Sequence, residues 1–459
     1  MYTFDTIVAP ATASGTASIN IIRISGKDAV NIGEKIFTPK IAKNNLSQNP
    51  RKLIYGHIVH NEKIIDEVMA CYMNAPHTFT CEDVVEINCH GGKKSVEEII
   101  SIILTSGARL AENGEFTKRA FLNGRIDLSQ AESVIDIINA KSSKAFENAQ
   151  KQLQGKLSKR IFDIDNALKK SLAQITVAID FPEEDVPEVT RQELTEDLDY
   201  CMENLQKLEK TYKDGKIISD GINIAIIGRP NVGKSSLLNE LLEENRAIVT
   251  DIAGTTRDII QESLSINGLC VNLVDTAGIR DTSDVVEKIG VERSISSIEN
   301  ADIILLMLDN STEISNDDIN LIEKLQQKQY IVLINKSDLD SKLNINHIPD
   351  FIDKNNIMNI SAEKKEGIEQ LKEKIYSMAI TYEDENTNSV MLTNSRHYAL
   401  IQNTISSLKD AKTAILNDVE LDIVETDYKD ALQYLGEITG ESVSESLLDT
   451  IFSQFCIGK

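Results

Sequence analysis

Residues 228–235 read Gly-Arg-Pro-Asn-Val-Gly-Lys-Ser, which is the pattern G-x-x-x-x-G-K-S. The stretch follows the apolar, β-branched run 222–227 and precedes a run of helix-forming residues, 236–244. Two glycines let the backbone turn its N–H groups toward phosphate oxygens, and the next helix adds its positive N-terminal end. Lys234 would reach the β- and γ-phosphates, and the Ser235 hydroxyl would bind Mg²⁺. The stretch therefore predicts a phosphate-binding loop between a strand and a helix.

Three more short motifs follow in order, each directly after an apolar run. Residues 275–278 read Asp-Thr-Ala-Gly and suit a Mg²⁺ and γ-phosphate sensor. Residues 335–338 read Asn-Lys-Ser-Asp, in which the Asp338 carboxylate would accept from the ring N–H and the amine of guanine. Ser361 and Ala362 resemble the last base-contacting loop. Because α/β sheets bind ligands at strand ends, four such loops together predict GTP, not ATP, as the nucleotide.

The loop at 250–258, Thr-Asp-Ile-Ala-Gly-Thr-Thr-Arg-Asp, occupies the position of a first switch. A threonine there can close on Mg²⁺ and the γ-phosphate. The residue after 275–278 is Ile279, where signalling GTPases place a glutamine that orients water. Isoleucine cannot hold water, so either hydrolysis is very slow or another side chain does this work. The candidates in the second switch are Arg280, Asp281, Asp284, Glu287 and Lys288.

Composition bounds the class of protein. The chain has 459 residues, a formal net charge of −24 and 41% hydrophobic residues, enough for several packed cores. Its six cysteines lack C-x-x-C spacing, which favours reduced thiols in a cytoplasmic protein without a zinc site. No apolar run is long enough for a membrane span, and the N-terminus lacks a signal-peptide pattern. With so much negative charge, an RNA substrate would need a local basic patch or a partner protein.

The order of patterns predicts an α/β multidomain protein. Residues 1–120 alternate strand-like and helical runs, and 121–218 form amphipathic helices that begin with a capping-box pattern at Asp127. Residues 219–378 alternate strands and helices, as a Ras-like G domain with a mainly parallel sheet requires. Residues 379–459 are helical again and end in Cys-Ile-Gly-Lys. We therefore expect a helical domain into which the G domain is inserted.

The whole chain resembles the TrmE–Era–Obg group of GTPases and, within it, the tRNA uridine-modification GTPases of the MnmE (TrmE) family. Beyond the GTPase loops, the motifs that carry the resemblance are Asp5-Thr6-Ile7-Val8-Ala9, Ile22-Arg23-Ile24-Ser25-Gly26, Phe79-Thr80-Cys81-Glu82-Asp83, His90-Gly91-Gly92, the run 114–123, Asp127-Leu128, Gly254-Thr255-Thr256-Arg257-Asp258 and Phe455-Cys456-Ile457-Gly458-Lys459. The first and the last are far more specific than the GTPase loops, which many families share.

The resemblance implies a homodimer formed through N-terminal folate-binding domains. It implies an MnmG-like flavoprotein partner, with FAD on that partner only, and a tetrahydrofolate derivative (5-formyl or methylene form) as one-carbon donor. The expected activity is potassium-dependent GTP hydrolysis coupled to adding an aminomethyl or carboxymethylaminomethyl group to C5 of the wobble uridine of certain tRNAs. In such a mechanism, a monovalent cation at the phosphates would supply the charge of an arginine finger.

The resemblance also implies roles for single residues. Lys234 and Glu287 would be catalytic, Glu287 by orienting water. The metal ligands would be Ser235 and Thr256 for Mg²⁺, and Asn231, Thr250, Ile252 and Thr255 for K⁺. The folate residues would be Arg23, Glu82, Arg125 and Lys459. The full expected GTP site is Asn231, Val232, Gly233, Lys234, Ser235, Ser236, Thr250, Asp251, Ile252, Ala253, Gly254, Thr255, Thr256, Asp275, Thr276, Ala277, Gly278, Asn335, Lys336, Asp338, Ser361 and Ala362.

Two other classes of function remain open at this point. An Era-type ribosome-assembly GTPase would act as an RNA-binding switch and would need a basic RNA-binding module, for which the sequence after the G domain offers no pattern. A pure signalling switch would turn over slowly without a potassium effect. Folate binding by residues 1–120 would distinguish the tRNA-modifying enzyme from the assembly factor.

Overall fold

The computed structural model describes residues 5–13, 15–180, 191–245, 262–274, 298–326, 328–381 and 389–459. The chain forms two compact units. One unit consists of residues 1–135, 158–162 and 432–459, and the other of residues 136–157 and 163–431. Among the described residues, no helix combines the length and the apolar character needed to cross a membrane.

The first unit is built on a seven-stranded sheet in the order β3-β4-β5-β6-β2-β1-β7. The pairs are antiparallel except for β1 and β7, which run parallel. The strands are β1 (Ile7–Pro10), β2 (Ile19–Ser25), β3 (Phe37–Pro39), β4 (Ile54–His60), β5 (Lys63–Met73), β6 (Val84–His90) and β7 (Arg109–Leu110). The antiparallel strands β4 and β5 form a hairpin that turns at Asn61 and Glu62, which both adopt positive φ.

The helices α1 (Ala29–Ile36) and α2 (Lys93–Thr105) supply apolar side chains to the core of this sheet. Alternate strand residues such as Ile22, Ile24 and Ile87 point into that core because side chains on a strand alternate between faces. A second core joins α3 (Glu115–Leu122), the start of α4 (Leu128–Asn139) and α16 (Glu445–Ser453). The C-terminal end of the chain therefore folds with residues from its first third.

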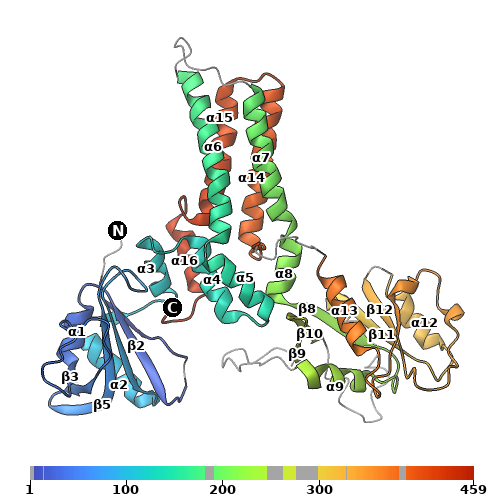
Figure 1. The fold of residues 1–459 in the computed structure, drawn as a ribbon, viewed down its shortest axis with the longest axis horizontal. Helices are drawn as coiled ribbons and strands as arrows, with labels where there is room; N and C mark the ends of the chain where they lie inside the picture. Colours follow the sequence, from blue (N-terminus) through green and yellow to red (C-terminus); the bar gives the residue numbers. More distant parts are fainter. Residues whose placement is uncertain are drawn as a thin grey trace. The chain divides into compact units, whose positions relative to one another are not determined.

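The second unit contains long helices that run side by side in Figure 1: α6 (Lys156–Asp180), α7 (Arg191–Lys210), α14 (Ser395–Leu416) and α15 (Leu421–Thr439). It also contains the shorter helices α5 (Ser143–Leu153) and α8 (Tyr212–Asp220). One face of α14 is apolar and buried, and it carries Ile401, Ile405, Leu408 and Ile415. The expected capping box is also present: the Asp127 N–H donates to Gln130, and the Gln130 N–H donates to the Asp127 carboxylate.

The same unit contains a six-stranded sheet in the order β13-β12-β11-β8-β10-β9. All neighbours are parallel except the edge strand β9, so the expected mainly parallel sheet is confirmed. Its elements are β8 (Ile222–Ile227), α9 (Lys234–Asn245), β9 (Glu262–Ile266), β10 (Leu269–Val274), β11 (Ile303–Asp309), α12 (Asn316–Glu323), β12 (Gln329–Asn335), β13 (Ile357–Asn359) and α13 (Ile368–Ala379).

The two ends of this inserted segment meet. The buried Asp214 carboxylate in α8 accepts from the backbone N–H of Thr381 at 3.0 Å. Nearby, the Thr211 hydroxyl accepts from the N–H of Leu392 at 3.0 Å. Entry and exit therefore lie together, the geometry that lets one domain be inserted into another. The exact boundaries expected at 218 and 378 stay predictions.

Candidate functional site

The phosphate-binding loop lies between β8 and α9, as its pattern predicts. Gly228 and Gly233 have φ of +150° and +102°, which side chains rarely adopt. A Cβ on Gly233 would lie 2.2 Å from the Asn335 side-chain nitrogen, and one on Gly228 would lie 2.6 Å from the carbonyl oxygen of Met307. Both positions therefore require glycine for space as well as for backbone conformation.

Lys234 begins α9, and its ammonium group folds back over the loop. It donates to the carbonyl oxygens of Gly228 and Arg229 at 2.7 and 2.8 Å. Burial lowers the pKa of this lysine. A partly desolvated ammonium held at the mouth of a glycine loop and at a helix N-terminus suits an anionic ligand.

Asn335 joins three of the expected loops. Its buried side chain donates to the carbonyl oxygen of Val232 at 2.8 Å and accepts from the N–H of Ala362 at 3.0 Å. One amide thus connects the phosphate loop, the end of β12 and the loop after β13. This is the meeting of strand-end loops that the parallel sheet predicts.

The Asp338 carboxylate is held in place by Ser361. The Ser361 hydroxyl donates to it at 2.6 Å, and this bond holds the pKa of Asp338 below its usual range. The carboxylate is exposed and remains charged at neutral pH. Ser361 is itself buried and accepts from the N–H of Lys364 at 3.2 Å, which fixes its hydroxyl beneath Asp338.

Lys336 and Arg229 hold the surrounding loops. Lys336, at φ +62°, donates to Asp309 at the end of β11 at 2.5 Å. Burial raises the pKa of Asp309, but the bonds from Lys336 and Ser311 outweigh it and keep the pKa low. Arg229 donates to the buried Asp318 in α12 at 2.8 Å. The sequence pattern does not reveal the roles of Arg229, Asp309 and Asp318, because each acts through a partner that lies far along the chain.

Several expected site residues lie outside the described residues. They are Thr250, Asp251, Ile252, Ala253, Gly254, Thr255, Thr256, Asp275, Thr276, Ala277, Gly278 and Glu287. Their roles toward Mg²⁺, K⁺ and water stay predictions. Asn231, Ser235 and Ser236 are described and lie exposed at or just after the phosphate loop.

A second cluster, here called the N-terminal site, consists of Arg23, Phe79, Glu82, Arg119 and Arg125. The guanidinium carbons of Arg23 and Arg125 lie 5.3 and 4.5 Å from the centre of the Phe79 ring. Such distances are typical of cation–π contacts. Burial lowers the pKa of Arg125. Two of the expected folate residues therefore converge on one aromatic ring that the sequence analysis quoted only as part of a motif.

Glu82 is fixed from two sides. Arg119 donates to both carboxylate oxygens at 3.1 Å, and the Ser25 hydroxyl donates to one of them at 2.7 Å. Arg119 also bonds Glu115 and Asp5 at 2.8 Å each. Burial would lower the pKa of Arg119, but its pairing with Glu82 and Glu115 outweighs this and raises it. Arg119 is the residue of this cluster that sequence reasoning did not single out.

The chain terminus lies beside this cluster. The carbonyl oxygen of Lys459 accepts from the N–H of Phe116 at 3.2 Å, and Ile457 pairs with Asn113 in an isolated bridge. A Cβ on Gly458, at φ +93°, would lie 1.9 Å from the Pro10 carbonyl oxygen. Since the Phe116 ring lies 5.6 Å from Arg23, the terminal Cys-Ile-Gly-Lys reaches the same region as the expected folate residues.

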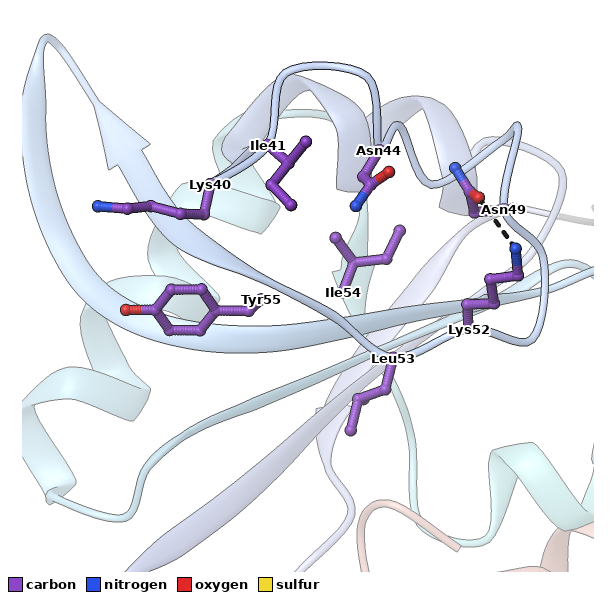
Figure 2. A pocket seen from close by; sticks show the side chains of 8 residues that line it. All are labelled: Lys40, Ile41, Asn44, Asn49, Lys52, Leu53, Ile54 and Tyr55. Atoms are coloured by element: carbon purple, nitrogen blue, oxygen red, sulfur yellow. Dashed lines mark hydrogen bonds between the residues drawn. The ribbon is translucent and has the colours of Figure 1, made fainter.

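A separate pocket of about 270 Å³ opens beside β3 and β4 and contains none of these residues. Figure 2 shows the side chains that line it: Lys40, Ile41, Asn44, Asn49, Lys52, Leu53, Ile54 and Tyr55.

The strand-end loops on a mainly parallel sheet define the class of the protein, a P-loop GTP-binding protein. Comparison with known proteins refines this class. Residues 6–125 match the family described as GTP-binding protein TrmE N-terminus, and residues 128–456 match the MnmE helical domain.

Relatives match over essentially the whole chain. The protein is 51% identical to the tRNA modification GTPase MnmE of Clostridioides difficile (strain 630), and the match covers 100% of both chains. It is 47% identical to the protein of that name from Alkaliphilus metalliredigens (strain QYMF), again over 100% of both. The Lactococcus lactis subsp. cremoris (strain MG1363) protein is 49% identical over 99% of both. The chain belongs to the MnmE family of tRNA modification GTPases, which confirms the expected family, fold class and hydrolase activity.

Proposed function

We propose that the protein is a potassium-dependent GTPase that, with an MnmG-like flavoprotein, adds an aminomethyl or carboxymethylaminomethyl group to C5 of the wobble uridine of certain tRNAs. The observation that carries the proposal is that one chain combines two sites. Asn335 ties together the loops of a GTP site, and Arg23, Arg125 and Glu82 gather around Phe79 in a domain that matches the TrmE N-terminus.

In the GTP site, Lys234 and the backbone of the phosphate loop would bind the phosphates. Gly233 leaves no space for a Cβ, which fits a backbone that closely approaches its ligand. Ser235 and Thr256 would hold Mg²⁺, and Asn231, Thr250, Ile252 and Thr255 would hold K⁺. Asn231 is exposed at φ +64°, so its side-chain oxygen is free to face a cation. The bound cations would neutralise charge that develops on the phosphates.

Glu287 would orient the attacking water, because Ile279 stands where a glutamine would otherwise do so. Asp338 would accept from the guanine ring N–H and amine, and its low pKa keeps it in the accepting form. Lys336 and Asn335 would hold the base-binding loop in shape through Asp309, Val232 and Ala362.

The N-terminal site would bind a tetrahydrofolate derivative in its 5-formyl or methylene form. Glu82 would accept from the donor edge of the pterin, and Arg23, Arg125 and Lys459 would meet its anionic glutamate tail. The residues present fit such a ligand, since an aromatic ring, a buried carboxylate and two cations converge there. When bound, the folate would supply the one-carbon unit, while FAD would be carried by the partner.

The proposed assembly is a homodimer joined through the N-terminal domains and acting in the cytoplasm, where its tRNA substrate is found. Exposed apolar side chains on the N-terminal sheet support an interface: Ile64 on β5 is 66% exposed and Ile19 on β2 is 61% exposed. Light scattering on the purified protein should give twice the chain mass of 51.0 kDa. A monomeric mass would exclude the dimer.

The decisive experiment is nucleoside analysis of tRNA from a strain that lacks the gene. We expect the substituent at C5 of the wobble uridine to be missing, restored by the wild-type chain and not by Lys234→Ala. Intact modification in the deletion strain would refute the proposal. Altered ribosome assembly with normal tRNA would favour the Era-type switch instead.

The proposed role of K⁺ in hydrolysis can be tested separately. Replacing K⁺ by Na⁺ should lower the GTP turnover strongly, and Glu287→Ala should slow hydrolysis while GTP affinity is unchanged. Equal turnover in both salts would remove the cation from the mechanism. Loss of GTP binding in Glu287→Ala would assign that residue a structural role.

A further inference from the structure

One segment of this acidic chain carries no acidic residue. The protein has 72 Asp and Glu against 48 Lys and Arg, yet residues 35–61 contain five Lys or Arg and neither Asp nor Glu. The five are Lys35, Lys40, Lys43, Arg51 and Lys52. The same stretch provides every residue that lines the 270 Å³ pocket. A local reversal of charge and a concave surface therefore coincide in one place.

The backbone around the pocket is well anchored. The Lys40 N–H donates to the carbonyl oxygen of Tyr55 at 3.0 Å, which extends the β3–β4 ladder and sets the two residues side by side. Leu46 is buried in the core of the sheet, and this anchors the loop that contains Asn44 and Asn49. In Figure 2, Lys40 and Tyr55 lie at one end of the pocket, and Asn49 and Lys52 lie at the other.

Four of the five cations form no ion pair with any described residue. Within the described residues, Lys35, Lys40, Lys43 and Lys52 make no contact with a carboxylate, and all four are exposed. Lys52 has only a weak contact of 3.5 Å to Asn49. Arg51 is different, because it donates to the carbonyl oxygens of Asn74 and His77 and so has a structural role.

The two carboxylates that approach the region are already engaged. Glu34 accepts from the N–H and the hydroxyl of Ser47 at 2.9 and 2.6 Å. Glu67 accepts from the Tyr55 hydroxyl at 2.6 Å. Glu34 is therefore bonded to Ser47 and Glu67 to Tyr55. The hydrogen bond that Tyr55 donates to Glu67 also fixes the orientation of the tyrosine ring.

Aromatic rings accompany the lysines. Tyr55 is 42% exposed, and the His57 ring lies beside it at 6.0 Å between centres. Unpaired RNA bases stack on such rings, asparagine amides reach base edges and ribose hydroxyls, and lysines neutralise the backbone phosphates. Free phosphate shares only the last of these interactions, so the ring next to the lysines favours a nucleic-acid strand.

We infer that the pocket formed by Lys40, Asn44, Asn49, Lys52 and Tyr55 is a docking site for the sugar-phosphate backbone of RNA, with Tyr55 stacking on an unpaired base. The inference rests on the proposed function, in which tRNA is the substrate, and adds where this chain touches it. It also explains how a protein with a charge of −24 can approach a polyanion, since the contact is confined to a basic island.

The test measures binding of unmodified tRNA to the full-length protein by fluorescence anisotropy over a range of KCl concentrations. Lys40→Gln combined with Lys52→Gln should weaken binding about tenfold and flatten the plot of log affinity against log salt by about two units, one for each lost phosphate contact. The control pair, Lys27→Gln with Lys94→Gln, removes the same charge from exposed lysines elsewhere in the N-terminal unit and should leave both quantities unchanged.

Substitutions at Tyr55 distinguish the contribution of base stacking from that of charge. Tyr55→Ala should weaken tRNA binding about fivefold without changing the salt slope, while Tyr55→Phe should bind like the wild type because the ring remains. GTP hydrolysis in the absence of tRNA should be the same in all variants. Inorganic phosphate at low millimolar concentration should not compete with tRNA.

Each contrary outcome has a distinct meaning. Unchanged binding in the Lys40/Lys52 variant, or an equal loss in the control pair, would refute this docking site while leaving the proposed function intact. Competition by inorganic phosphate would make the pocket a site for free anions and also refute it. Failure of the wild-type protein to bind any tRNA would count against the proposed function as well.

Discussion

The GTP site and the N-terminal site are assembled in opposite ways. The GTP site consists of short contiguous motifs, each following its own strand, and Asn335 joins the ends of these loops. In the N-terminal site, Arg23 lies on β2, and Phe79 and Glu82 lie in a loop. Arg119 lies in α3, and Arg125 follows that helix. No two of its cations are neighbours in the sequence.

This difference follows from sheet topology. In a parallel sheet the carboxyl ends of all strands meet at one edge, so motifs at those ends are close in space whatever lies between them. The N-terminal sheet is mostly antiparallel, so successive strand ends alternate between its two edges. Its site depends instead on one buried ion-pair network centred on Arg119. Because the two sites are built separately, a change in one should leave the other unaffected.

The largest effect is expected for Arg119→Ala. The substitution leaves the largely buried Glu82 carboxylate without its cation, whereas Glu115 keeps its pair with Arg109, and an unpaired buried charge costs about 3–5 kcal/mol. Calorimetry should show the transition of the N-terminal unit at a temperature lower by roughly 10 °C. GTP affinity should be unchanged.

Arg109→Ala is the matched control. Arg109 also pairs with Glu115 and Asp5, but its side chain is 43% exposed and does not reach Glu82. We expect its removal to cost about 1 kcal/mol. Equal destabilisation by both variants would show that the network is not centred on Arg119, and a loss of GTP affinity would show that the two sites are coupled.

The next effect concerns the GTP site. Gly233→Ala places a Cβ 2.2 Å from the Asn335 side chain at a φ of +102°, so the phosphate loop or Asn335 must move. GTP affinity should fall about 100-fold, which corresponds to about 2.7 kcal/mol. Gly92→Ala is the control, because nothing lies within 4 Å of its added Cβ. Near-normal GTP titration of Gly233→Ala would contradict the close packing of the two loops.

The smallest effect concerns pH. The Ser361 hydroxyl lowers the pKa of Asp338, so the charged carboxylate that accepts from guanine is present above its ordinary pKa and is lost only as pH falls through the lowered one. Ser361→Ala should raise the pKa of Asp338. The pH below which GTP affinity falls should therefore be higher in this variant than in the wild type. Titrations below about pH 5, which span the ordinary aspartate pKa of about 3.9, would measure this. Ser337→Ala, in the same loop, should behave as the wild type, and identical profiles for Ser361→Ala would refute the role of the hydroxyl.

Sequence patterns predicted most of the fold and part of the sites. The strand-like runs in residues 1–120 predicted the strands of the first sheet, and the alternation of strands and helices after residue 219 predicted the parallel sheet, because the hydrophobic pattern reports which residues are buried. The sequence did not predict the roles of Arg229, Asp309, Asp318 and Arg119, because each contacts a partner that only folding brings near.

The sequence by itself determined the nucleotide class, because phosphate and guanine recognition rely on backbone loops whose glycines and polar residues must be contiguous. Only the tertiary structure decided that Arg119 holds Glu82, that the chain terminus reaches the first strand, and that a basic pocket opens in an acidic protein. The physical reason is the same in all three cases. Ion pairs, stacking contacts and cavities depend on distance in space, which separation along the chain does not reveal.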